Sequence, residues 1–306
     1  MAEYHVPVML QECLDGLNIN PDGIYVDVTF GGGGHSRAIL ERLSAKGKLV
    51  AFDQDEDARK NLPADKRLIF IDQNFRFLSN HLQYQGLVPV DGLLADLGVS
   101  SHQFDIDERG FSFRFDEAEL DMRMNRTQEI SAASVLNTYN ESRLADIFYL
   151  FGELKNSRQL AKAIVISRNA QPIKTVGELK QAIGKFAPKF KDYKFYAQVF
   201  QALRIEVNHE IDVLKQLLLQ TPDLFKAEGR LVVMSYHSLE DRLVKNFMQT
   251  GNLEGVTQKD FYGNILRPFD PIGKTTVAGD VELESNNRGR SAKLRIATRR
   301  KENSPN

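Results

Sequence analysis

The sequence contains a single cysteine, Cys13, among its 306 residues. One cysteine excludes an intramolecular disulfide and any zinc site built on several cysteines, which favours a reducing, cytoplasmic compartment. The six histidines show no spacing typical of metal-ligand pairs, so we expect no metal. No apolar run approaches the roughly 18 residues of a membrane-spanning helix, and the first residues do not resemble a signal peptide. We therefore expect a cytoplasmic globular protein without a membrane partner.

The net charge is only −1, so overall charge does not indicate a nucleic-acid partner. The charges are unevenly distributed, however. Residues 155–204 carry eleven Lys/Arg against two acids, residues 288–301 carry seven Lys/Arg and no acid, and residues 91–130 carry ten acids against four arginines. Such runs are either solvated surface or two basic flanks around an acidic site, which is a plausible footprint for an RNA backbone.

The order of the apolar segments predicts an α/β fold. Short, nearly continuous apolar runs alternate with helical patterns in the first half, as in a parallel sheet that is buried on both faces. The expected strands are 24–28, 48–52, 67–71, 90–95, 230–235 and 293–297. Residues from about 131 to 220 have helical periodicity, and 195–220 is long enough to form one helix. We therefore expect a Rossmann-like domain over 1–105 and 208–306, interrupted by a helical domain over 106–207.

The strongest local signal is the glycine cluster Gly31–Gly34, which directly follows the first expected strand. Glycines let a ligand lie against the backbone, and Ser36 is a candidate cap for a helix over 36–46. Asp53 ends the next strand 22 residues after Gly31, where an acid grips an adenosine ribose. The cluster does not match the dinucleotide pattern or the P-loop pattern. S-adenosylmethionine (SAM), which has no pyrophosphate, is a candidate that these residues leave open.

Three further residues belong to this expected pocket, each with an alternative role. Asp27 either binds the ammonium group of SAM or accepts hydrogen bonds from loop amides. Phe75, after the third strand, either contacts adenine or packs in the core. Asp96 ends the fourth strand and faces the crevice in which open α/β sheets bind ligands, unless it caps a loop or helix.

With these residues in place, the chain resembles the bacterial 16S rRNA (cytosine-N4) methyltransferases over essentially its whole length. The matching stretches are 5–8, 23–36, 91–103, 108–113, 120–124, 200–208, 235–242 and 291–297. The resemblance implies SAM as methyl donor and N4 of cytidine 1402, in the 16S rRNA of the small ribosomal subunit, as acceptor. Carried over position by position, the SAM contacts are Gly33, Gly34, His35, Asp53, Phe75, Asp96 and Gln103.

The exocyclic amine of cytosine is a poor nucleophile because its lone pair is delocalised into the ring, so positioning should dominate catalysis. Asp96, or the backbone carbonyls of Leu97 and Gly98, are candidate acceptors for the amine hydrogens. His35 and His237 are candidate proton acceptors, although a lone histidine is more often structural. The aromatic side chain that stacks on the target base is expected among Tyr236, Phe111 and Phe113, the last two of which equally fit a half-buried strand.

Two other classes of protein share some of these features. A nicotinamide-dependent dehydrogenase would use a related sheet, but the imperfect dinucleotide pattern disfavours it. A non-catalytic RNA-binding or assembly factor would suit the basic insertion, but it would not need the set of cofactor residues.

Overall fold

A computed structural model of the chain describes residues 7–100, 103 and 109–301. The chain forms two compact units, one of residues 1–98 and 211–306 and one of residues 99–210. The boundary that the sequence places between 105 and 106 lies outside the described residues. Among the described residues, no helix combines the length and apolar character needed to cross a membrane.

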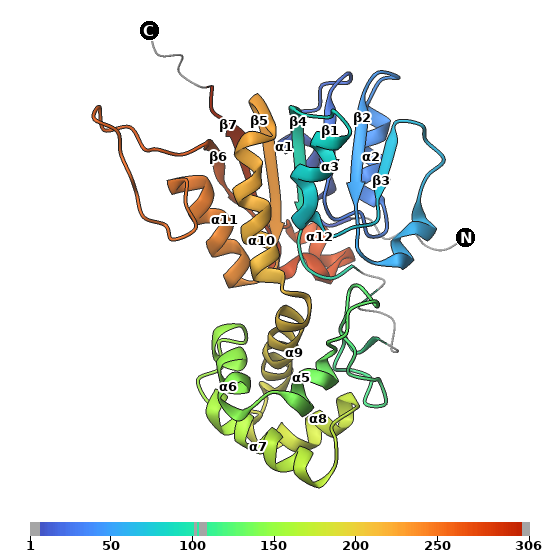
Figure 1. The fold of residues 1–306 in the computed structure, drawn as a ribbon, viewed down its shortest axis with the longest axis vertical. Helices are drawn as coiled ribbons and strands as arrows, with labels where there is room; N and C mark the ends of the chain where they lie inside the picture. Colours follow the sequence, from blue (N-terminus) through green and yellow to red (C-terminus); the bar gives the residue numbers. More distant parts are fainter. Residues whose placement is uncertain (1–6, 101–102, 104–108, 302–306) are drawn as a thin grey trace. The chain divides into compact units, whose positions relative to one another are not determined.

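The first unit is built on a seven-stranded sheet in the order β3-β2-β1-β4-β5-β7-β6 (Figure 1). The strands are β1 Ile24–Asp27, β2 Lys48–Phe52, β3 Leu68–Ile71, β4 Val90–Asp96, β5 Phe225–Ser235, β6 Phe269–Thr276 and β7 Lys293–Arg299. Neighbouring strands from β3 to β5 are parallel, and β7 runs antiparallel to both β5 and β6. The expected α/β class is confirmed, because five neighbouring parallel strands with helices on both faces form a Rossmann-like sheet.

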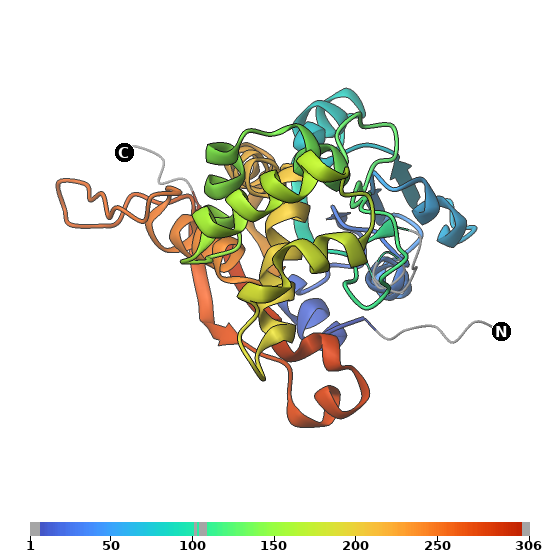
Figure 2. The same cartoon turned by 90° about the horizontal axis from the view of Figure 1, so that it is seen from below.

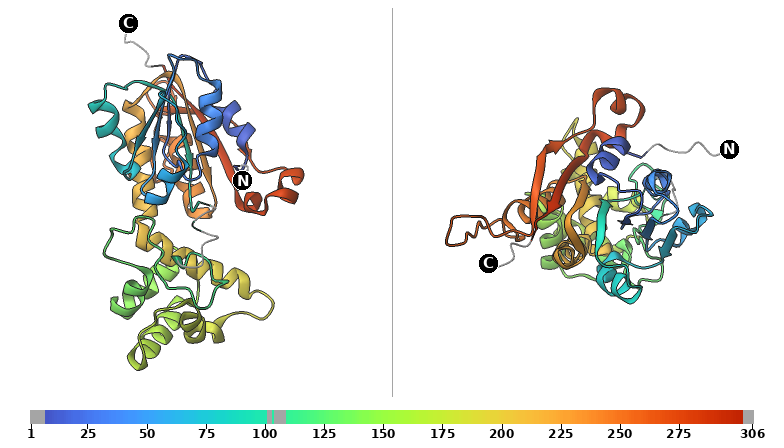
Figure 3. Two further views of the ribbon diagram at one scale, coloured as in Figure 1. Left: turned by 90° about the vertical axis from the view of Figure 1, so that its right-hand side faces the viewer. Right: turned by 90° about the horizontal axis from the view of Figure 1, so that it is seen from above.

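Helices cover both faces of this sheet, because alternate residues of each strand point to opposite faces. Cys13 and Leu14 of α1 (Leu10–Leu17) and Ile39 of α2 (Gly34–Arg42) pack on one face with Val232 and Met234. The other face receives α3 (Leu78–Tyr84), α10 (Glu210–Gln220) and α11 (Ser238–Thr250) against residues such as Leu231 and Val233. The two views in Figure 3 show helices on either side of the sheet. Helix α12 spans Asp280–Ser285.

The sequence did not predict strand β6. Pro271 and Gly273 interrupt its apolar pattern, and both are residues that weaken a strand signal. The strand forms at the edge of the sheet, where only one side needs backbone partners, and an edge tolerates proline.

The second unit is mostly helical and has its own apolar core. Its helices are α5 Ala132–Thr138, α6 Glu141–Leu150, α7 Ser157–Ala170, α8 Val176–Ile183 and α9 Asp192–Asn208 (Figure 2). The single helix expected over 195–220 is wrong. His209 adopts a left-handed backbone with φ 52°, which ends α9 one residue before α10 begins. The strand considered around Phe111 and Phe113 does not form.

Asn208 connects the last turn of α9 to an irregular segment of the second unit. Its side-chain amide nitrogen donates to the carbonyls of Met122 (2.8 Å) and Arg204 (2.9 Å), and its side-chain oxygen accepts from the amide of Met124 at 2.7 Å. The side chain is almost fully buried. The side-chain amide therefore bonds three backbone groups, of which those of Met122 and Met124 lie outside any helix or strand and find in it a hydrogen-bond partner away from water.

We predict that Asn208→Ala lowers the free energy of unfolding by about 2–4 kcal/mol, because buried backbone groups lose their hydrogen bonds. Urea denaturation followed by circular dichroism measures the change. Asn169→Ala, an exposed position on α7, is the matched control and should behave like the wild type. Equal stability of the Asn208 and Asn169 variants would contradict this role.

Candidate active site

The glycine loop begins at the carboxyl end of β1 with a buried acid. Asp27 Oδ1 accepts from the backbone amide and hydroxyl of Thr29, at 3.0 and 3.3 Å, and Oδ2 accepts from the Ser36 hydroxyl at 2.6 Å. Of the two roles expected for Asp27, loop fixation is the one that these contacts show. Ser36 therefore does not cap α2. Gly33, whose φ of 76° disfavours other residues, stands at the cap position.

The top of this loop leaves room for a ligand. A Cβ added at Gly32 would meet no atom within 4 Å, whereas one added at Gly33 would collide with the Phe30 ring at 2.8 Å. His35, in the first turn of α2, is buried, and its Nε2 has no hydrogen-bond partner among the described residues. Buried polar atoms are normally hydrogen-bonded, so this nitrogen is suited to meet a bound molecule.

Asp53 lies directly after β2 and is tied to the same loop. Its Oδ2 accepts from the amide of Gly31 at 2.7 Å, and its Oδ1 accepts from the amide of Asp55 at 2.9 Å. Burial raises the pKa of Asp53 from 3.8 to about 6, although both amides act to lower it. The carboxylate is thus ionised at neutral pH, and each oxygen keeps a lone pair for a ligand hydroxyl.

Phe75 begins a short 3-10 helix, Phe75–Phe77, after β3. Its ring is only partly buried and packs against the core below the sheet. The side-chain amide of the neighbouring Asn74 donates to the side-chain oxygen of Gln54, the residue after Asp53, at 2.8 Å. This hydrogen bond joins the segment after β2 to the segment after β3. Phe75 packs against the core with one part of its ring and leaves another part accessible.

Asp96 ends β4, the other neighbour of β1. Its Oδ1 accepts from the Tyr236 hydroxyl at 2.8 Å, its Oδ2 lies 3.7 Å from His35 Nδ1, and its backbone amide donates to the Thr29 hydroxyl at 2.7 Å. Burial raises the pKa of Asp96 to about 6, while His35 and Tyr236 lower it. Burial and the negative charge of Asp96 raise the pKa of Tyr236, so that phenol remains a donor.

Tyr236 is held in place from both sides. Its ring lies 3.4 Å from where a Cβ at Gly98 would stand, and its backbone amide donates to Glu240 at 2.9 Å. The next residue, His237, caps α11. Its ring nitrogen Nδ1 accepts from the Glu240 backbone amide at 3.4 Å, and the Glu240 carboxylate accepts from the His237 backbone amide. His237 therefore has a capping role in the structure.

Hydrogen bonds link Asp53 to the glycine loop and Asp96 to Tyr236, and the Asp96 carboxylate also lies 3.7 Å from His35 Nδ1. The sequence named these residues but not the Tyr236–Asp96 bond, because 140 residues separate the two partners. The sequence analysis also missed Thr29, whose hydroxyl contacts both Asp27 and the backbone of Asp96. The signal for it is a hydroxyl residue two positions after the acid that ends the first strand. Gln103 lies in the second unit, where its Oε1 accepts from the amide of Ser100 at 3.1 Å.

A glycine loop after the first strand, with acids at the ends of its two neighbouring strands, forms the ligand crevice of a Rossmann-like sheet. The MraW methylase family matches residues 2–300, and the chain belongs to that family. It is a methyltransferase that uses SAM as its methyl donor.

Curated relatives match along nearly the whole chain. One named ribosomal RNA small subunit methyltransferase H, from Bacteroides thetaiotaomicron, is 57% identical over 97% of this chain and 98% of its own. One of the same name from Parabacteroides distasonis is 58% identical over 96% of this chain and 97% of its own. Among solved structures, a putative rRNA-methylase from Clostridium thermocellum shares 12% identity at a TM-score of 0.45, covering 97% of this chain and all of that one.

We predict that Asp53→Ala weakens SAM binding by about 1.5–3 kcal/mol, the usual loss for a charge-assisted hydrogen bond. Calorimetric titration with SAM measures the effect. Asp53→Asn separates the two roles of the side chain, because it keeps an acceptor for the Gly31 amide while removing the charge. Unchanged SAM affinity in a folded Asp53→Ala protein would remove Asp53 from the cofactor site.

Proposed function

We propose that the protein transfers the methyl group of SAM to N4 of cytidine 1402 in 16S rRNA. Family membership supports the chemistry, and relatives more than half identical along their whole length carry the name ribosomal RNA small subunit methyltransferase H. Because the proposed substrate is ribosomal RNA, we propose that the protein acts in the cytoplasm. The two other classes considered from the sequence, a dehydrogenase and a non-catalytic RNA-binding factor, do not fit a member of a methylase family.

We assign the cofactor contacts to Gly33, Gly34, His35, Asp53, Phe75, Asp96 and Gln103. The open space above Gly32, the unpaired Nε2 of His35 and the remaining acceptor capacity of Asp53 fit a nucleoside ligand. Asp53 would accept the ribose hydroxyls, and the accessible face of Phe75 would contact adenine. When bound, SAM supplies an electrophilic methyl group on a positively charged sulfur, which a crevice rich in carboxylates complements.

The proposed role of Asp96 is to accept a hydrogen bond from the target amine. The Tyr236 hydroxyl occupies one oxygen of the carboxylate and fixes its orientation, which leaves the second oxygen as acceptor. Holding the amine hydrogens favours a pyramidal nitrogen whose lone pair points at the methyl carbon. The N–C bond forms as the C–S bond breaks, and the surplus amine proton leaves through the acceptor. These steps use protein oxygens and call for no metal.

We further propose that the domain expected over 106–207 recognises the RNA of the small subunit. Lys185, Lys189 and Lys191 are exposed on the short segment that precedes α9, and Phe190 between them is fully exposed with a left-handed φ of 65°. Cations interleaved with exposed aromatic rings suit a single-stranded nucleic acid.

Nucleoside mass spectrometry of 16S rRNA tests the function directly. In cells that lack this protein, N4-methylated cytidine at position 1402 should disappear, and it should return when the wild-type gene is restored. The modification persisting in the deletion strain would refute the proposed target.

We predict that Asp96→Asn lowers the rate of methyl transfer by about 10²- to 10⁴-fold, the usual range for a positioned acid or base, with a much smaller change in SAM affinity. The wild-type rate should fall as the pH drops through about 6, because the carboxyl group then becomes protonated. The Asn variant should lack this dependence. Single turnovers on unmodified small subunits at several SAM concentrations measure both, and a variant rate restored by saturating SAM would contradict the role in chemistry.

We predict that reversing Lys185, Lys189 and Lys191 to glutamate weakens RNA binding and flattens its salt dependence, with SAM affinity unchanged. Filter binding to 16S rRNA across a range of salt concentrations measures the slope. Reversal of Lys46, Lys48 and Lys66, which are exposed on the first unit, is the matched control. An equal salt slope in both triple variants would mean that the three lysines of the insertion are ordinary surface.

A further inference from the structure

The connection between α11 and β6 carries two exposed aromatic rings on a defined turn. Residues 251–268, which we call the arm, run from the end of α11 to the start of the edge strand β6 (Figures 1 and 2). At its tip, Asp260 accepts from the amides of Tyr262 (2.9 Å) and Asn264 (2.8 Å), and from the Asn264 side chain at 3.0 Å. A bridge between Lys259 and Ile265 closes the turn. The backbone of the tip is therefore fixed by its own hydrogen bonds.

This turn presents Phe261 and Tyr262 to solvent. Their side chains are 98% and 86% exposed, and the two rings meet edge to face with centroids 5.7 Å apart. Most large apolar side chains of this unit lie in its core, and exposed ones that are held on a rigid turn mark an interaction site. The rings add nothing to the packing of the sheet, so their position calls for a partner.

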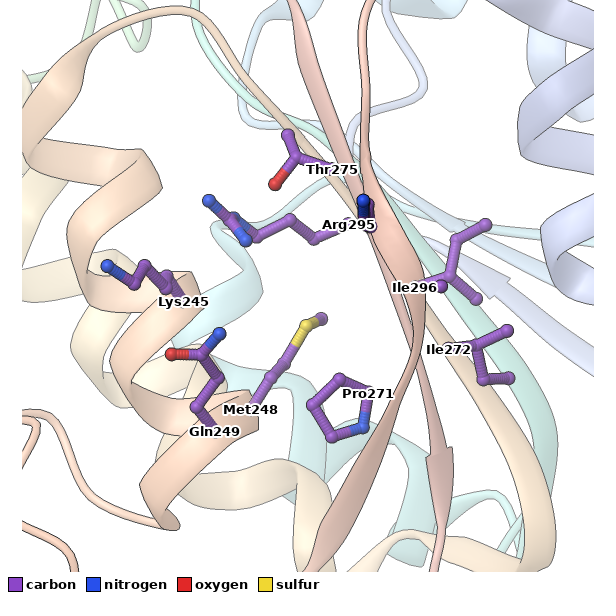
Figure 4. Close-up of a pocket in the computed structure, with 10 residues that line it drawn as sticks. Lys245, Met248, Gln249, Pro271, Ile272, Thr275, Arg295 and Ile296 are labelled. Carbon is purple, nitrogen blue, oxygen red and sulfur yellow. The ribbon is translucent and has the colours of Figure 1, made fainter.

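A pocket of about 330 Å³ lies at the base of the arm, between α11 and the β6–β7 edge (Figure 4). Figure 4 shows Arg295 extending from β7 toward α11, with Met248 and Pro271 lining the gap. Lys245 and Lys274 also line the pocket, and neither has an ion-pair partner among the described residues. Among the described residues, Asp241 is the carboxylate that pairs with Arg295, and Lys293 contacts it too, so the pocket has an excess of positive charge.

We propose that the arm and this pocket form an RNA-binding site on the methyltransferase unit. Phe261 and Tyr262 stack on unpaired bases, and Lys245, Lys274 and Arg295 bind the adjacent phosphates. The proposal rests on the proposed RNA substrate and adds a contact outside the insertion.

The cations favour RNA over a protein partner. Val256 and Leu266 on the arm are also exposed, which alone would suit either. Lysine, however, is depleted from protein–protein interfaces, whereas unpaired lysines beside exposed aromatic rings are the usual combination for single-stranded nucleic acid. A pocket that holds three cations and one carboxylate neighbour matches a phosphate chain better than a protein surface.

Two labelled probes of equal length separate stacking from charge: a 12-nucleotide oligoadenylate and the same ribose-phosphate chain without bases. With the full-length protein, the double change Phe261→Ala and Tyr262→Ala should weaken oligoadenylate binding about tenfold or more, and should leave binding of the abasic chain unchanged. Lys245→Glu with Lys274→Glu should weaken both and lower the slope of log affinity against log salt by about 1.4, for two phosphates on a single strand.

Tyr84→Ala at the end of α3, 91% exposed, and Lys48→Glu with Lys66→Glu are the matched controls and should bind both probes as the wild type does. Unchanged oligoadenylate affinity in the aromatic variant, or an equal loss with the abasic chain, would overturn the stacking site. So would a change of sedimentation coefficient in that variant without loss of RNA affinity, which would indicate a second copy as partner. Methyl transfer by the wild type is measured in parallel, so that its absence would refute the proposed function separately.

Discussion

Three carboxylates stand at the carboxyl ends of three adjacent parallel strands, and the rest of the site depends on how their charge is stabilised. Asp27 ends β1, Asp53 follows β2 and Asp96 ends β4, with β1 between the other two strands. The charge of Asp27 raises the pKa of both of the others, on top of the larger effect of burial. Like charges this close are tolerated because each carboxylate receives backbone amides or hydroxyls. The same hydrogen bonds fix the conformation of the glycine loop, the start of α2 and the orientation of the Tyr236 ring.

The same arrangement explains which ligand the crevice favours. A dinucleotide brings its own negative phosphates to the glycine loop, where these acids would repel them. A ligand with a positive sulfur and an ammonium group relieves the repulsion instead. We therefore propose that the cationic methyl donor and these carboxylates stabilise one another, in agreement with the family assignment.

The sequence predicted those parts of the fold that depend on residues close together along the chain. Apolar runs gave the four parallel strands of the first half, and the spacing from Gly31 to Asp53 located the loop and its acid. The failures have physical causes. Pro271 and Gly273 weaken the sequence signal of an edge strand, and a left-handed His209 separates two helices whose apolar periodicity is continuous. Gly33, rather than Ser36, occupies the N-cap position of α2. The Tyr236–Asp96 bond joins β4 to the residue after β5, a pairing that only the parallel register of these strands reveals.

That register also explains why one residue, Asp96, carries so much of the proposed chemistry. Its strand is central, with β1 on one side and β5 on the other, and the chain passes into the second unit at Val99, three residues later. Thr29 from the β1 loop fixes its backbone, and Tyr236 from the end of β5 fixes its side chain. A group that must hold an amine to within a few tenths of an ångström needs such support from independent elements. The carboxylate of Asp53, in contrast, accepts from the backbone amides of Gly31 and Asp55, while its own backbone amide donates to the Ile71 carbonyl of β3 at 3.3 Å. We propose that backbone donors alone suit the Asp53 carboxylate to binding a ribose, whereas the tyrosine hydroxyl suits the Asp96 carboxylate to orienting a reacting nitrogen.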